Sequence, residues 1–137
     1  MDFEKIKKEW IVNEEEYSKT KLSDLILKLS SSCKITKNGQ VIVSKNLSGR
    51  KILKFILSAR FVANAADSSI PREITREELK AYSGLKDKVF ASRLSDMLRE
   101  NFAEKIDDKN IRAKNILFIE RFLNDFKNEN IKMKGDE

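Results

Sequence analysis

The sequence predicts a mainly α-helical fold with a small amount of β structure, and three observations lead to this class. Apolar residues recur at helical spacing through most of the chain. Asn38-Gly39, a strong tight-turn signal, separates two short runs of strand-forming residues and predicts a hairpin. Between Ile74 and Lys105, two short helical patterns are joined at Gly84 and lead into an extended segment. The 137 residues suffice for one domain with its own apolar core.

Residues 1–32 are expected to form an N-terminal helical arm, and residues 33–137 the main domain. The arm carries two apolar stripes, one of Phe3, Ile6 and Trp10 and one of Leu22, Leu25, Ile26 and Leu29. They predict either two helices that meet near Asn13 or one long helix that changes face there. An amphipathic helix must bury its stripe against something. Two alternatives therefore stay open: a dimerisation arm, and packing on the same subunit.

The main domain begins with the hairpin, over residues 33–45, and a first helix over residues 49–66. Ser48 is a good N-cap for this helix. A helix pair follows over residues 75–101, then a second hairpin over residues 102–113. A last helix covers residues 116–127, with Asn115 as its candidate cap, and the polar residues after it are expected to fray.

Start and stop signals define the helix pair. Thr75 and Glu78 have the spacing of a capping box, and Gly84 suits a left-handed turn after the first helix. Asn101 tolerates that conformation and can end the second helix. The core stripe of the second helix is Phe90, Leu94, Met97 and Leu98. The residues between these fall on the other face: Lys86, Lys88, Val89, Ser92, Arg93 and Asp96.

This run of elements resembles the winged-helix (helix-turn-helix) transcription regulators, particularly the small archaeal and bacterial kind. The resemblance lies in Glu78-Leu79, the Ser83-Gly84-Leu85 turn, the helix from Lys86 to Glu100, and Asn101-Phe102-Ala103. Two positions depart from the family pattern. Lys86-Asp87-Lys88 stands where a Ser or Thr is usual, and Asn101 replaces a glycine.

The resemblance implies a winged helix-turn-helix fold, with residues 102–113 as the wing. It also implies a homodimer that binds double-stranded DNA with the residue 86–100 helix in the major groove. The expected DNA-binding residues are Lys86, Lys88, Val89, Ser92 and Arg93 on that helix, Arg76 and Lys80 on the helix before it, and Lys109 and Arg112 on the wing. Among these, Arg93 is expected to read guanine, and Lys86 and Lys88 to pair with phosphate.

Composition narrows the functional classes further. The net charge of +6 favours a polyanionic partner. The chain has no histidine, and Cys33 is its only cysteine, so neither a zinc site nor an intramolecular disulfide is expected. We predict no catalytic, cofactor or metal site, no small-molecule substrate and no enzyme activity. The sequence shows no signal peptide and no membrane-spanning run, which favours a cytoplasmic protein.

The leading hypothesis from the sequence is therefore a DNA-binding winged-helix transcription regulator. The alternative is a winged-helix module for protein–protein interaction without DNA binding, because a fold does not fix a function.

Overall fold

The computed structural model describes residues 2–44 and 47–135, and the side chains of residues 2–44, 47–49 and 51–128. Met1, Asp136, Glu137 and the pair Lys45-Asn46, which includes the end of the expected hairpin, lie outside the described residues. The helices are α1 (Phe3–Trp10), α2 (Glu14–Ser30), α3 (Gly49–Ala66), α4 (Arg76–Ser83), α5 (Asp87–Arg99) and α6 (Ile116–Gly135). The strands are β1 (Cys33–Ile35), β2 (Val41–Val43), β3 (Ile74–Thr75), β4 (Ala103–Lys105) and β5 (Asn110–Ala113).

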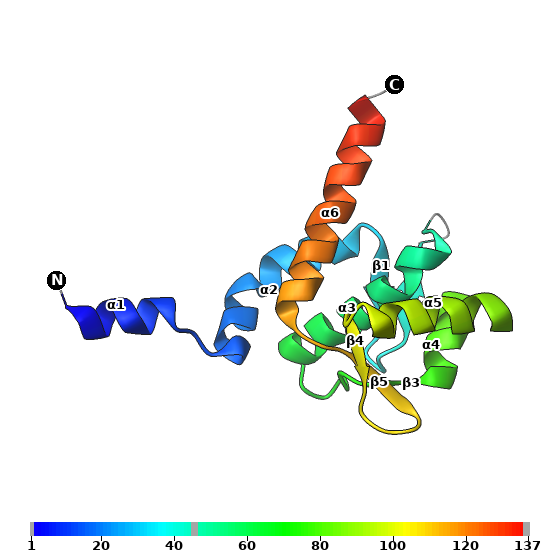
Figure 1. Ribbon diagram of the computed structural model, residues 1–137, viewed down its shortest axis with the longest axis horizontal. Helices are drawn as coiled ribbons and strands as arrows, with labels where there is room; N and C mark the ends of the chain where they lie inside the picture. Colours follow the sequence, from blue (N-terminus) through cyan, green and yellow to red (C-terminus); the bar gives the residue numbers. More distant parts are fainter. Residues whose placement is uncertain (1, 45–46, 136–137) are drawn as a thin grey trace.

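Helix α3 lies at the centre of the molecule and packs against α2, α4, α5 and both hairpins (Figure 1). Its middle residues Phe55, Ile56 and Leu57 are completely buried. A helix that is apolar around most of its circumference is typical of a core position, because each of its sides needs a partner. Ser48 is its N-cap residue, but the Ser48 side chain makes no capping hydrogen bond, contrary to the sequence prediction. The mainly helical class with a small antiparallel component is confirmed.

The β structure of the described chain forms two small antiparallel sheets. Strands β1 and β2 make the first hairpin, and β3, β5 and β4 lie side by side in that order in the second sheet. The sequence did not predict β3. Its two residues pair with β5 through Ile74↔Ile111 and Thr75↔Asn110, and β4 pairs with the other edge of β5. Strand β3 thus joins the start of α4 to the second hairpin.

The predicted N-terminal arm consists of two helices, of which only the second packs on the main domain. Helix α2 packs on α3 and α6 and contributes Leu25 and Leu29 to the core. Helix α1 ends at Trp10 and buries none of its residues. Asn13 caps α2, with its side-chain oxygen accepting from the Glu15 backbone amide at 2.8 Å. Of the two readings of this segment, the one with two helices that meet near Asn13 is therefore confirmed.

Helix α6 packs against α2 and α3 and completes the apolar core. Asn115 caps it by accepting from the Phe118 amide at 3.2 Å, as the sequence predicted. The rings of Phe122 and Phe126 meet the Phe55 ring of α3 edge to face, with centroids 4.9 and 4.8 Å away. The helix continues to Gly135 and so is longer than the expected range of 116–127. Lysine, glutamate and methionine in this stretch are good helix formers, which accounts for the extension.

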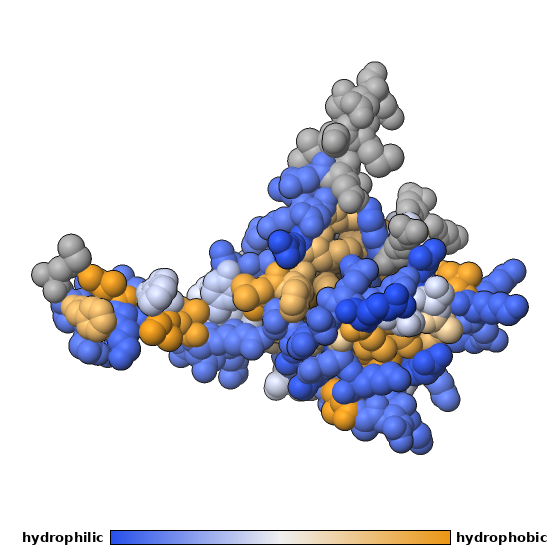
Figure 2. Space-filling model, viewed as in Figure 1, coloured by the Kyte–Doolittle hydropathy of each residue, from blue (hydrophilic) through white to orange (hydrophobic). Residues whose placement is uncertain are grey.

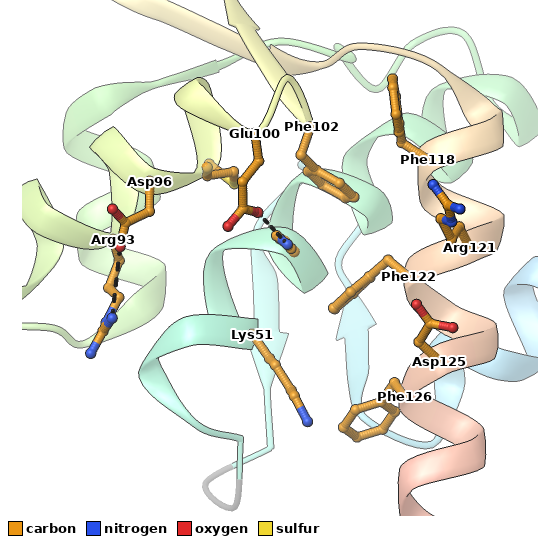
Figure 3. Close-up of a pocket in the computed structure, with 12 residues that line it drawn as sticks. Lys51, Arg93, Asp96, Glu100, Phe102, Phe118, Arg121, Phe122, Asp125 and Phe126 are labelled. Carbon is orange, nitrogen blue, oxygen red and sulfur yellow. Dashed lines mark ion pairs between the residues drawn. The ribbon is translucent and has the colours of Figure 1, made fainter.

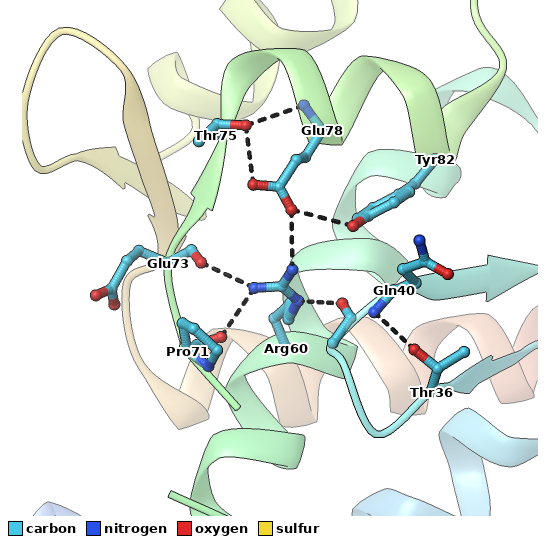
Figure 4. Close-up of polar contacts among 9 residues, drawn as sticks. Thr36, Gln40, Arg60, Pro71, Glu73, Thr75, Glu78 and Tyr82 are labelled. Atoms are coloured by element: carbon cyan, nitrogen blue, oxygen red, sulfur yellow. Dashed lines mark hydrogen bonds and ion pairs between the residues drawn. The ribbon is translucent and has the colours of Figure 1, made fainter. Parts of the chain in front are cut away.

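Arg60 is a buried charge on α3 that joins three separate segments (Figure 4). Its side chain is only 4% exposed. Its Nε donates to the Gly39 carbonyl at 2.5 Å, and its Nη1 donates to the carbonyls of Pro71 and Glu73, each at 3.0 Å. Its Nη2 donates to Glu78 Oε2 at 3.2 Å. One guanidinium thus holds the β1–β2 loop, the linker after α3, and α4.

Gly39 is required beside Arg60 for two reasons. Its φ of +88° is a conformation that side chains rarely adopt. A Cβ atom at this position would also lie 3.2 Å from the Arg60 Cζ, closer than an ordinary contact.

Replacing Arg60 by methionine should lower the free energy of unfolding by roughly 3 kcal/mol or more. Each buried carbonyl left without a donor costs about 1–3 kcal/mol. Arg60→Lys should also destabilise, because an ammonium group cannot donate in the planar fork geometry. Urea unfolding measures both. Arg99→Met, at a side chain that is 75% exposed, is the matched control and should change stability by less than about 0.5 kcal/mol. Equal stability of the Arg60→Met and Arg99→Met variants would show that Arg60 has no such role.

Glu78 links stability to pH. Burial raises the pKa of its carboxyl, but hydrogen bonds from Tyr82 and Thr75 and the charge of Arg60 outweigh burial and hold the pKa below its usual value. A carboxyl with a lowered folded pKa stabilises the fold above the unfolded pKa of about 4.3, and this contribution is lost as the pH falls through the folded value.

The free energy of unfolding of the wild type should therefore fall more steeply between about pH 5 and pH 3 than that of Glu78→Gln. Urea titrations at a series of pH values give the two slopes. Parallel slopes would mean that Glu78 does not carry this dependence.

Candidate nucleic-acid interface

Helix α4 starts and ends at the residues that the sequence predicts, except that Glu78 accepts from the Thr75 hydroxyl and not from the Thr75 backbone amide of a capping box. Thr75 Oγ1 accepts from the Glu78 backbone amide at 3.1 Å and donates to Glu78 Oε1 at the same distance. Gly84 has a φ of +69°, and its amide donates to the Lys80 carbonyl at 3.1 Å, which ends α4. Helix α5 begins three residues later, at Asp87. The chain therefore reverses within a few residues, and the orientation of α5 is set by this turn.

Helix α5 buries one side and exposes the opposite one. Phe90, Leu94 and Met97 are each 2% exposed, on the side where α5 packs against α3. The residues opposite this stripe are all exposed, and we call them the α5 outward face: Lys88, Ala91, Ser92, Ser95 and Arg99. Lys88 and Ser92 are among the DNA-contacting residues expected from the sequence, whereas Ser95 and Arg99 are not. Their spacing of seven and eleven residues from Lys88, which returns to the same side of a helix, was the available signal.

Val89 and Arg93 lie on one flank of α5 and not on the outward face. A Cβ atom on Gly49 of α3 would be 4.0 Å from Val89 Cγ1, so Val89 borders the start of α3. Arg93 is partly buried, and its Nη1 lies 3.8 Å from Asp96 Oδ2. Arg93 Nε is buried and has no hydrogen-bond partner among the described residues. The expected guanine-reading arginine is thus placed beside a groove and faces an acidic neighbour.

That groove runs between α5, α3 and α6 and has a volume of about 620 Å³ (Figure 3). Lys54 crosses it, with its Nζ 2.7 Å from Glu100 Oε2 and over the rings of Phe102 and Phe122 at 5.4 and 5.7 Å. The groove also contains the carboxylates of Asp96 and Asp125. Because carboxylates accompany the cations here, this flank is poorly suited to a polyanion.

Four of the expected DNA-contacting cations make contacts within the protein. Lys80 forms an ion pair with Asp87. Arg112 Nε lies 2.9 Å from Glu104 Oε1, across the β4–β5 pair. The Arg76 guanidinium lies 5.4 Å from the centroid of the Phe90 ring. Arg93, as described, faces Asp96.

The remaining three cations, Lys86, Lys88 and Lys109, are exposed and form no ion pair in the described part of the chain. Lys86 is the N-cap residue of α5, and Lys88 lies in its first turn. Free backbone amides and the helix dipole favour anions at this end of a helix. The start of α5 therefore combines two unpaired cations with a favourable backbone.

The β4–β5 turn has a mixed charge. The Asp107 carboxylate accepts from the backbone amides of Lys109 and Asn110, each at 2.8 Å. These bonds and the side-chain hydrogen bond from Asn110 hold the pKa of Asp107 below its usual value. Asp107 and Asp108 are both exposed beside Lys109, so this turn is weaker than α5 as a site for phosphate.

No protein-family model, curated protein or solved structure compared with this chain matches it. Among the described residues, no group of three or more carboxylate, cysteine or histidine side chains could hold a metal ion. None of the described helices has both the length and the apolar character needed to cross a lipid bilayer.

Two glycine substitutions should have opposite effects on stability. Gly84→Ala should lower the free energy of unfolding by roughly 1 kcal/mol, because a Cβ is strained at a φ of +69°. Gly49→Ala should raise it by up to about 1 kcal/mol, because alanine favours the helix. Its Cβ would lie 3.6 Å from Leu85 Cδ2, an ordinary contact. Urea unfolding measures both variants, and a Gly84→Ala variant as stable as the wild type would contradict the left-handed turn between α4 and α5.

Proposed function

We propose that this chain is a winged-helix protein that binds double-stranded DNA and acts as a transcription regulator, with α5 in the major groove. The observation that carries this proposal is the α5 outward face. It is exposed along the whole helix and contains no acidic residue, although Asp96 on the flank pairs with its Arg99 at 3.5 Å. It begins at Lys88, which, like the neighbouring Lys86, forms no ion pair in the described part of the chain. A helix of this kind fits the major groove, which is about 12 Å wide.

The order of elements supports the same assignment. Helix α3 is followed by β3, the α4–α5 pair and the β4–β5 hairpin, and β5 lies between β3 and β4. The hairpin projects beside the helix pair as a wing would (Figure 1). This is the arrangement that the resemblance of residues 74–113 implies.

The positions of the side chains suggest their roles. The N-terminal residues of a recognition helix contact base edges, so Ser92, and Lys88 in place of the phosphate role expected from the sequence, are assigned to the bases. Lys86 and Arg99, at the two ends of α5, are assigned to phosphates. Both arginines pair with Asp96, Arg99 at 3.5 Å and Arg93 at 3.8 Å, but the Arg99 side chain is 75% exposed on the outward face and that of Arg93 is 31% exposed on the flank, so we give Arg99 the larger part in binding. In a homodimer, two such helices about 34 Å apart would reach successive major grooves.

The alternative is a module that binds a protein partner. It is favoured by the carboxylates around α5 and the wing, which pair with Lys80, Arg93 and Arg112. A surface of closely spaced, mutually paired charges suits a polar protein interface better than a polyanion.

Fluorescence anisotropy with a labelled mixed-sequence duplex decides between the two. The wild type should bind, and its affinity should fall steeply between about 50 and 200 mM salt. Lys88→Glu and Arg99→Glu should each weaken binding by about tenfold or more, equivalent to about 1–3 kcal/mol. Lys86→Ala should lower the salt slope by about one.

Lys19→Glu on α2 is the control, because it makes the same charge change at a side chain that is 63% exposed and remote from α5. It should bind DNA as the wild type does. An equal loss for Lys19→Glu and Lys88→Glu would remove α5 from the site. No binding at micromolar protein and low salt would exclude DNA as the partner.

A further inference from the structure

Helix α1 has an apolar stripe that no part of the described chain covers. Phe3, Ile6 and Trp10 follow one another at helical spacing and are 71%, 42% and 82% exposed. The helix projects from the body of the molecule (Figure 1), and apolar side chains gather over it and the segment that follows (Figure 2). Ile11 and Val12, in that segment, are also more than half exposed.

A helix of this size needs a surface to pack on. It has eight residues, and isolated helices shorter than about 12–15 residues are marginal in water. It is nevertheless a complete helix, because Asp2 caps it by accepting from the Glu4 amide at 3.1 Å, and Asn13 starts α2 separately. The well-formed start and the uncovered stripe together indicate a docking partner.

The body of the same chain offers an apolar groove of about 410 Å³ between α2, β1 and α3. Its walls include Ile26, Leu29, Ile35, Val62, Ala63 and Ile70. Ile26 is 42% exposed at the edge of this groove. Lys34 and Asp67 stand among the lining residues, and α1 carries Glu9 and Lys7 on the two sides of its stripe, so each rim charge has an opposite partner available.

The short segment between α1 and α2 limits whether α1 can reach the groove of its own chain or only that of a second copy. Two residues, Ile11 and Val12, separate Trp10 from Asn13, and the three Cα–Cα steps span at most about 10 Å. Ile26 lies thirteen residues further along α2, which is about 20 Å of helix. Trp10 of the same chain therefore stays beside the first half of α2, and α1 points away from the second half (Figure 1). A second copy has no such restriction.

We propose that α1 of one copy seats its Phe3, Ile6 and Trp10 stripe in the α2–β1–α3 groove of a second copy, and that the exchange is reciprocal. Reciprocal exchange closes a twofold dimer, in which both stripes and both grooves are covered. The proposal supplies the interface for the homodimer named under the proposed function. Its test contains no DNA, so a failure of DNA binding and a failure of this interface are distinguishable.

Trp10 is the only tryptophan of the chain and reports its own burial. Its emission should move to shorter wavelength as the protein concentration rises from nanomolar to tens of micromolar. The mass from light scattering should double over the same range. Both changes should be absent in Ile6→Glu, which alters the stripe, and in Ile26→Glu, which alters the groove. Ile106→Glu, at a β4–β5 turn residue that is 45% exposed, is the matched control and should dimerise as the wild type does.

Mixing the two variants separates a lost interface from a damaged fold. An equimolar mixture of Ile6→Glu and Ile26→Glu retains one intact stripe and one intact groove facing each other, and should therefore associate where neither variant does alone. Blue-shifted emission from a species with the mass of a monomer would show that α1 docks on its own chain. Red emission from a monomer at all concentrations, dimerisation of Ile26→Glu, or no association of the mixture would each overturn the proposal.

Discussion

The Arg60 guanidinium is the interaction on which the arrangement of the other segments depends. A buried charge is tolerated only when its hydrogen-bonding capacity is used, and Arg60 uses three backbone carbonyls and one carboxylate. These acceptors belong to segments that share no strand pairing with one another, so their relative positions are set through α3. The planar guanidinium group donates its hydrogen bonds in fixed directions, so it orients these segments relative to α3. An apolar residue of the same volume could not do so.

The candidate DNA-binding surface is reached from Arg60 by a short chain of contacts. Arg60 holds Glu78, and Glu78 also binds the Thr75 hydroxyl that caps α4. Helix α4 then ends at Gly84, whose left-handed conformation turns the chain into α5. Each step leaves little freedom, because each is a hydrogen bond or a backbone conformation with one accessible geometry. The outward face of α5 is therefore positioned by residues that do not belong to it.

The sequence allowed some of these features to be predicted and concealed others. Thr75, Gly84 and the apolar stripe of α5 act locally, so caps, turn residues and spacing were sufficient signals. Strand β3 could not be predicted, because it has two residues and pairs with a segment more than thirty positions away. In the sequence, Arg60 cannot be told from a surface arginine, because its hydrogen-bond acceptors come together only in the folded chain. Arg93 was expected to contact DNA and Arg99 was not, and only the position of Arg93 beside the groove with α3 and α6 distinguishes them, because Asp96 pairs with both.

The position of Thr75 joins two parts that are usually linked by a loop. It ends β3, where it pairs with Asn110 of β5, and it is also the N-cap of α4. The next amide, of Arg76, donates to the Lys109 carbonyl at 2.9 Å. No loop residue separates the sheet from the helix, so we expect a displacement of the β4–β5 hairpin to shift the first turn of α4 with it. Binding at the hairpin would then alter the position of the α4–α5 turn.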